Sequence, residues 1–157
     1  MKKILLTLFI AFSALATQAQ EIKWLTLDEA LAAQKKTPKP IFMDVYTDWC
    51  GPCKMLDKNT FHDAAIVKFI SDNFYAVKFN SEFNFDVTYT WQKYSNPNYQ
   101  ADRKGRNAQH QFAGFLQITG YPSMIIFDKK GEIQPAIVGY HTPEQLMPQL
   151  KNIVNKK

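Results

Sequence analysis

The stretch that decides the fold is residues 41–54, IFMDVYTDWCGPCK. Its apolar first half predicts a buried strand, and helix-favouring sequence follows the two cysteines. Cys50 and Cys53 are the only cysteines of the chain, and their spacing places both sulfurs on the first turn of a helix, within reach of each other. Free amides and the helix dipole stabilise a thiolate there, so we expect an exposed, nucleophilic Cys50.

The residues between the cysteines suit this position. Pro52 fits an early helical position, where its missing N–H has no intrahelical acceptor, and Gly51 lets a partner chain come close.

A zinc site and a purely structural disulfide both account less well for the cysteine pair. Zinc would need two more thiolate or imidazole ligands, and the histidines His62, His110 and His141 are scattered without ligand spacing. A structural disulfide would close a loop too short to constrain the unfolded chain much. We therefore predict a redox disulfide between Cys50 and Cys53, with no metal and no cofactor.

Beyond the dithiol, the chain resembles the thioredoxin family from about residue 24 to residue 154. Residues 75–78, YAVK, match a second parallel strand, and residues 120–123, GYPS, match the family's cis-proline turn. Residues 124–132 and 138–140 resemble the last strands and their hairpin turn. The resemblance implies an α/β, thioredoxin-like fold with a central mixed β-sheet flanked by helices.

Asp44 is the candidate proton carrier. It interrupts an apolar strand, and an unpaired buried carboxylate would cost several kcal/mol, so it should be paired or protonated. By resemblance, its carboxyl exchanges a proton with the second thiol, Cys53, and burial raises its pKa toward neutrality. Lys78 on the neighbouring strand would be its charge partner. The alternative is that Asp44 lies at a strand edge and faces water.

The resemblance also implies a partner-binding surface around the dithiol. A cis bond between Tyr121 and Pro122 would face the cysteines and leave the preceding backbone free to pair with an extended partner segment. Trp49 would add a flat apolar platform, and Gly139 at the end of the last strand completes the surface together with Gly51 and Pro52. The alternatives are an ordinary turn proline and a half-buried tryptophan.

The N-terminus has the features of a secretory signal. Lys2 and Lys3 precede an apolar run at residues 4–16, and we expect cleavage after Ala19. The run is short for a membrane span, so a retained anchor is the less favoured alternative. We expect export to the bacterial periplasm, no stable membrane anchor, and one domain at residues 20–157.

Charge argues against nucleic acid as a partner. Loss of Lys2 and Lys3 lowers the formal net charge of +5 by two, and the remaining basic residues are spread among acids. The expected partners are protein disulfide substrates and an upstream thiol electron donor, for which a membrane-embedded carrier is one candidate.

The chain departs from the family between about residues 80 and 110. We expect an inserted excursion at residues 83–106. Its first part alternates apolar and polar residues, which predicts a strand with one apolar face made of Phe83, Phe85, Val87, Tyr89 and Trp91. We predict an added hairpin. It either packs on the core or forms part of a partner-docking surface.

Helix boundaries are predicted from capping signals. Thr26 and Glu29 form a capping-box pattern before a helix at residues 27–36. Asp63 is an expected N-cap for a helix through residue 70, and a further helix is expected at residues 109–117.

Three functions remain open on the sequence. The resemblance to the thioredoxin family favours a reductant of protein disulfides, since in that family a Gly-Pro pair between the cysteines accompanies reducing potentials, about −270 mV in thioredoxin. The same site could serve an oxidase or isomerase. A peptide-binding, chaperone-like module with an incidental dithiol is the third candidate.

Overall fold

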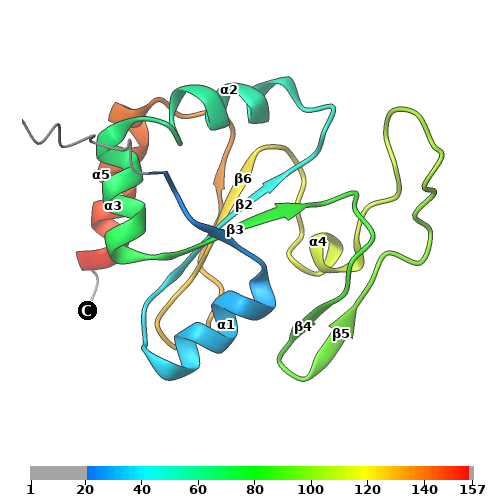
Figure 1. Ribbon diagram of the computed structural model, residues 1–157, viewed down its shortest axis with the longest axis horizontal. Helices are drawn as coiled ribbons and strands as arrows, with labels where there is room; N and C mark the ends of the chain where they lie inside the picture. Colours follow the sequence, from blue (N-terminus) through cyan, green and yellow to red (C-terminus); the bar gives the residue numbers. More distant parts are fainter. Residues whose placement is uncertain (1–20, 156–157) are drawn as a thin grey trace, which may run out of the picture.

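The computed structural model describes residues 21–155, and the expected signal segment at residues 1–19 lies outside them. Five strands form one mixed sheet in the order β1-β3-β2-β6-β7 (Figure 1). They are β1 Trp24–Leu25, β2 Ile41–Tyr46, β3 Tyr75–Asn80, β6 Ser123–Phe127 and β7 Ile137–Val138. β1, β3 and β2 run parallel, β6 is antiparallel to β2, and β7 is antiparallel to β6. The predicted thioredoxin-like α/β fold is confirmed.

Helices cover both faces of this sheet. One face carries α2 Gly51–Asn59, α3 Ala64–Asn73 and α5 Pro143–Asn155, and the other carries α1 Leu27–Lys36 and α4 Gln111–Phe115 (Figure 1). Side chains alternate along β2, so Phe42 packs with the first group while Met43 and Val45 pack with the second. Asp44 shares the parity of Phe42 and therefore faces the α2 side. Within residues 21–155, no helix is long and apolar enough to cross a membrane.

Two predicted helix starts are confirmed. The Glu29 N–H donates to Thr26 Oγ1, and the Glu29 carboxylate accepts from the Thr26 N–H in return. Asp63 accepts from two amides of α3, which continues to Asn73 rather than ending at residue 70.

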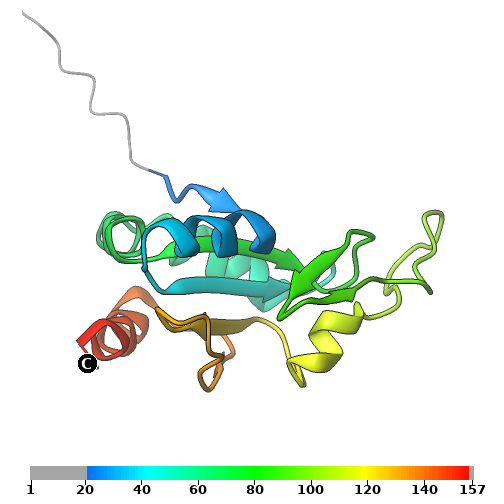
Figure 2. The same ribbon diagram turned by 90° about the horizontal axis from the view of Figure 1, so that it is seen from below.

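The predicted hairpin is present between β3 and α4. β4 Val87–Tyr89 and β5 Gln92–Tyr94 form a separate two-stranded sheet. Val87, Tyr89 and Tyr94 are buried in the cluster that also contains Phe112 of α4, so the hairpin extends the core. Figure 2 shows the hairpin and the following loop projecting at the end of the molecule opposite α3 and α5.

The prediction of one strand with a single apolar face over residues 83–91 is wrong. Phe83 is half exposed, and Trp91 lies in the hairpin turn with 96% of its surface exposed. Thr90 and Trp91 are the two central residues of the hairpin turn, and their φ angles are +46° and +68°. Positive φ at both central residues is a geometry that two-residue hairpin turns favour. Strand alternation therefore stops at Tyr89.

The helix predicted at residues 109–117 is shorter, because His110 is its N-cap and Gln117 takes a left-handed φ of +54°. The fully buried His110 ring joins the segment before β4 to α4. Its Nδ1 accepts from the Phe112 N–H at 3.1 Å, and its Nε2 lies 2.7 Å from the Phe85 carbonyl oxygen. The Nε2 atom must therefore carry the proton. Burial lowers the pKa of His110, which keeps the ring neutral.

Replacing His110 with alanine should lower the free energy of unfolding by about 2–4 kcal/mol, because two buried polar groups lose their partner and a cavity opens. Urea unfolding followed by circular dichroism measures this loss. The exposed His62 is the matched control, and His62→Ala should change the value by less than about 0.5 kcal/mol. Equal effects of the two substitutions would contradict the assignment.

Candidate active site

The two cysteines lie at the N-terminus of α2, shortly after the end of β2 (Figure 1). They are joined in a disulfide. Cys50 is the N-cap residue, and its Sγ accepts a hydrogen bond from the Cys53 N–H at 3.1 Å. An amide at a helix start that points at one sulfur stabilises negative charge on that sulfur once the disulfide opens. This contact distinguishes the environment of Cys50 Sγ from that of Cys53 Sγ.

The expectation that Cys50 is exposed is wrong for the disulfide form. Cys50 is 3% exposed and Cys53 is 5% exposed, so both are buried to a similar degree. Bonded sulfurs cover part of each other's surface, which lowers the exposure of both. The amide hydrogen bond, not exposure, separates the two cysteines.

Gly51 and Pro52 form the exposed side of the dithiol turn. A methyl group at Gly51 would meet no atom within 4 Å, so packing inside the molecule does not require glycine there. Pro52 lies in the first turn of α2, where no intrahelical acceptor awaits its N–H. The turn is therefore open to the approach of another chain.

The Tyr121–Pro122 peptide bond is cis, as the resemblance implied. Val45 pairs with Ser123, so Pro122 lies beside the end of β2 from which the dithiol segment starts. The Gly139 N–H donates to the Pro122 carbonyl at 2.8 Å, and Gly139 has a φ of +92° that favours glycine. The structure thus brings Pro122 and Gly139 together next to the dithiol.

Asp44 lies in the central strand of the sheet and is 1% exposed, which excludes the alternative of a water-facing strand edge. Lys78 Nζ donates to Asp44 Oδ2 at 2.8 Å, whereas Oδ1 is buried and has no hydrogen-bond partner within residues 21–155. Burial raises the pKa of Asp44, and the Lys78 cation opposes this only in part. The carboxyl therefore keeps a proton at higher pH than an exposed aspartate does.

Lys78 lies between two carboxylates. It pairs in register with Asp44, and its Nζ also donates to Asp57 Oδ1 at 2.7 Å. Burial acts to lower the pKa of Lys78, but the two carboxylates outweigh it and the net shift is upward, so the side chain stays a cation. Three aromatic rings surround the ammonium group at 4.7–5.2 Å, those of Trp24, Tyr46 and Phe61.

Asp57 was not among the site residues expected from the sequence. It follows Cys53 by four residues on α2, and helical periodicity places both on one face. The four-residue spacing was a signal in the sequence. It indicates a site residue only because β3 places Lys78 next to this face of α2.

An open pocket of about 580 Å³ connects Cys53 with the charged residues. Cys53, Asp57 and Lys78 line it together with residues 46–48 and Lys54. A space of this size admits water. Asp57 and Lys78 share it with Cys53, whereas Asp44 lies behind Lys78 and contacts the Lys78 ammonium group.

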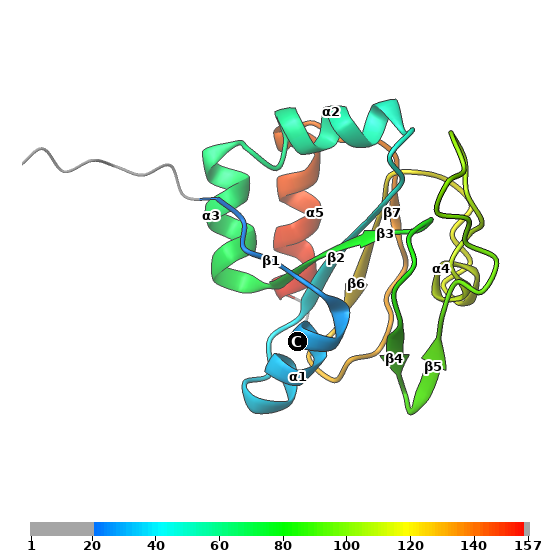
Figure 3. The ribbon, with the colours of Figure 1, turned by 45° about the vertical axis from the view of Figure 1, so that its right-hand side comes forward.

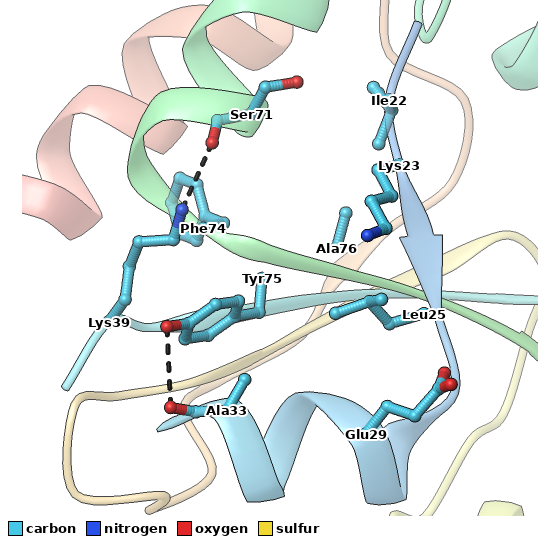
Figure 4. Close-up of a pocket in the computed structure, with 10 residues that line it drawn as sticks. All are labelled: Ile22, Lys23, Leu25, Glu29, Ala33, Lys39, Ser71, Phe74, Tyr75 and Ala76. Atoms are coloured by element: carbon cyan, nitrogen blue, oxygen red, sulfur yellow. Dashed lines mark hydrogen bonds between the residues drawn. The ribbon is translucent and has the colours of Figure 1, made fainter. Parts of the chain in front are cut away.

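A separate pocket of about 380 Å³ lies at the β1–β3 edge of the sheet (Figure 4). In it Lys39 Nζ donates to the Ser71 carbonyl at 3.1 Å, and the Tyr75 hydroxyl donates to the Ala33 carbonyl at 3.5 Å. Neither cysteine nor any residue of the Asp44–Lys78–Asp57 network lines this pocket, so it is not part of the dithiol site.

Trp49 is 38% exposed and has three contacts that fix its ring. Its Nε1–H donates to Glu82 Oε1 at 2.9 Å, and its ring packs edge-on against Tyr121 with the centroids 5.9 Å apart. The Arg106 guanidinium carbon lies 4.2 Å from the ring centre. Glu82 and Arg106 were not expected at the site, since no local sequence signal tells where the long connection between β3 and α4 passes.

Comparison with known families agrees with this geometry. The profile of a family described as a thioredoxin-like domain matches residues 27–153. The chain belongs to this family. The Cys50–Cys53 pair of this thioredoxin-like chain fits a Cys-x-x-Cys site.

The thioredoxin-like chain is similar to one part of larger proteins. It is 31% identical over 127 residues to the thiol:disulfide interchange protein DsbD of Pectobacterium atrosepticum, covering 80% of this chain and 18% of that protein. The chain thus spans about a fifth of the length of the curated relatives it matches.

Solved structures share the fold at lower identity. "DsbH Oxidoreductase" has a TM-score of 0.64 and 16% identity, and the match covers 100% of this chain and 96% of that one. A "putative disulphide-isomerase from Bacteroides thetaiotaomicron" has a TM-score of 0.61 and 23% identity, with 89% and 98% covered.

Asp44→Asn should remove a pH dependence of stability. Because the folded-state pKa is raised, the native protein retains a proton that the unfolded chain has lost above the ordinary aspartate value of 3.8. The wild-type free energy of unfolding therefore falls, by up to about 1.4 kcal/mol per pH unit, until pH reaches the folded-state pKa. The asparagine variant should lack this fall and be the more stable protein at pH 8.

Urea unfolding of both proteins between pH 4 and pH 8 measures the effect. Asp72→Asn is the control, because Asp72 is exposed and the substitution should leave the slope in place. Parallel curves for wild type and Asp44→Asn would show that Asp44 does not retain a proton in the fold.

Proposed function

We propose that this chain is an exported thiol:disulfide oxidoreductase that reduces disulfides of partner proteins. The observation that carries the proposal is the Cys50–Cys53 disulfide at the start of α2, beside the cis Pro122. The family match and the partial similarity to DsbD proteins support the activity class. The signal features of residues 1–19 support export to the periplasm, ahead of one domain at residues 20–157.

The proposed cycle is a dithiol exchange. The Cys50 thiolate attacks one sulfur of a partner disulfide, forms a mixed disulfide and releases the first partner thiolate. Cys53 then loses its proton and attacks Cys50 Sγ, which releases the second partner thiolate. The partner gains the two electrons that the cysteines lose, and Cys50 and Cys53 are left as the disulfide seen here. The partner's two thiolates take up two protons, one that came from Cys53 and one from solvent, which received it when Cys50 ionised. An upstream dithiol donor returns them to thiols.

Asp44 is the proposed proton acceptor for Cys53. Burial raises the pKa of Asp44, which is the direction that makes an aspartate a better proton acceptor. Lys78 stabilises the carboxylate form of Asp44, which is the form that accepts the proton. The pocket lined by Cys53 and Lys78 supplies a route through water as far as the Lys78 ammonium group.

The partner segment is proposed to bind along the exposed dithiol turn. Gly51 and Pro52 leave that turn open, and the backbone of Tyr121 before Pro122 is the proposed site of strand pairing. Trp49 and Gly139 lie at the border of this surface.

The redox midpoint distinguishes the reductant from its alternatives. We expect a value near −270 mV, as for thioredoxin. Equilibration of the mature protein in graded thiol buffers, read by thiol labelling, gives the reduced fraction. A midpoint above about −180 mV would instead favour an oxidase or isomerase, and failure to form the disulfide would favour a peptide-binding module.

Cys53→Ser should trap partner proteins as stable mixed disulfides, because the first attack proceeds and the resolving thiol is missing. Non-reducing gels of the variant incubated with a disulfide-containing protein measure the adduct. Cys50→Ser is the matched control and should trap little. Equal trapping by the two variants would contradict the assigned order of attack, and full biological activity of the double serine variant would contradict the proposed function.

A further inference from the structure

Arg106 is a cation beside the dithiol that the exchange cycle does not use. It belongs to the loop between β5 and α4, which lies next to the N-terminal end of α2 (Figure 3). Its guanidinium carbon lies 4.2 Å from the centre of the Trp49 ring, and Trp49 directly precedes Cys50. Stacking of a guanidinium on an indole face is favourable and keeps the N–H donors at the edge of the plane accessible.

A carboxylate fixes the loop to the ring. Glu82 Oε1 accepts from Trp49 Nε1–H, and Glu82 Oε2 accepts from the Asn107 N–H, both at 2.9 Å. One side chain therefore joins the indole to the residue that follows Arg106. Tyr121 packs edge-on against the same indole, so the position of the ring is defined on two sides.

The guanidinium retains its capacity to bind an anion. Arg106 is exposed, and within residues 21–155 it forms no salt bridge. Both oxygens of Glu82 already accept hydrogen bonds from other donors. Arg103 and Lys104 are also exposed on this loop, against one acid, Asp102, so the loop is positively charged. Arginine presents a planar set of donors that matches a carboxylate.

We propose that Arg106, positioned by Trp49 and Glu82, binds an acidic side chain next to the reactive cysteine of the partner protein. The inference rests on the proposed exchange function. The mixed disulfide forms at Cys50, so the residues that flank the partner's cysteine pass over the neighbouring Trp49, where the guanidinium lies. Arg106 is then a specificity residue supplied by the connection between β3 and α4.

Matched disulfide peptides test this directly. Three peptides differ only in the residue next to the cysteine, which is Glu, Gln or Lys, and kcat/KM for their reduction is divided by the rate with dithiothreitol to remove intrinsic reactivity. The wild type should prefer the Glu peptide over the Lys peptide by about fivefold at low salt, and less at 0.5 M salt. Arg106→Gln should abolish the preference, and Arg106→Glu should reverse it.

Arg103→Gln is the matched control, because it removes the same charge from the same loop at a residue without a contact to Trp49. It should retain the preference. A wild type without preference, a preference that survives in Arg106→Gln, or equal loss in Arg103→Gln would overturn the inference. If Arg106→Gln changed kcat/KM equally for all three peptides and shifted the redox midpoint, Arg106 would act on Cys50 and not on the partner's side chain. That result would also overturn the inference. A wild type that reduces none of the peptides would overturn the proposed function itself.

Discussion

The buried Asp44 carboxylate, paired with Lys78 in the middle of the sheet, is the constraint on which the site depends. A carboxyl group that is 1% exposed in a central strand must be compensated, and the parallel register of β2 with β3 places Lys78 directly opposite. The ammonium group is in turn surrounded by Asp57 of α2 and by aromatic rings. The same network thus ties the helix that carries the dithiol to the two strands below it.

This arrangement also explains why the two cysteines are chemically different although both are buried. Cys50 Sγ receives an amide hydrogen bond at the helix start, whereas Cys53 lines the pocket that it shares with Lys78 and Asp57. An amide at a helix start favours negative charge on the sulfur that it contacts. The proposed cycle therefore uses Cys50 as the attacking thiolate and Cys53 as the thiol that gives up a proton. Both differences follow from the position of the first turn of α2 above the Asp44–Lys78 ion pair.

The connection between β3 and α4 has two physical roles. Its hairpin contributes Val87, Tyr89 and Tyr94 to the core, and the neutral His110 ring fastens it to α4. Two charged residues of the same connection, Glu82 and Arg106, point away from this core and contact the indole of Trp49. Because the apolar part fixes the path of the chain, the charged part contacts Trp49, the residue before Cys50, in a defined position.

The sequence by itself determined the features that depend on neighbours along the chain. The dithiol at a helix start, the Thr26 and Asp63 caps and the strand containing Asp44 all follow from local pattern, because capping and strand burial act over a few residues. The end of alternation at Tyr89, the exposure of Trp91 and the shortened α4 were missed, since turn geometry and the His110 contacts overrode periodicity. Only the tertiary structure decided that Asp57 shares Lys78 and that Glu82 and Arg106 lie on Trp49, because these contacts join segments far apart in sequence whose distance depends on how the sheet and the connection pack.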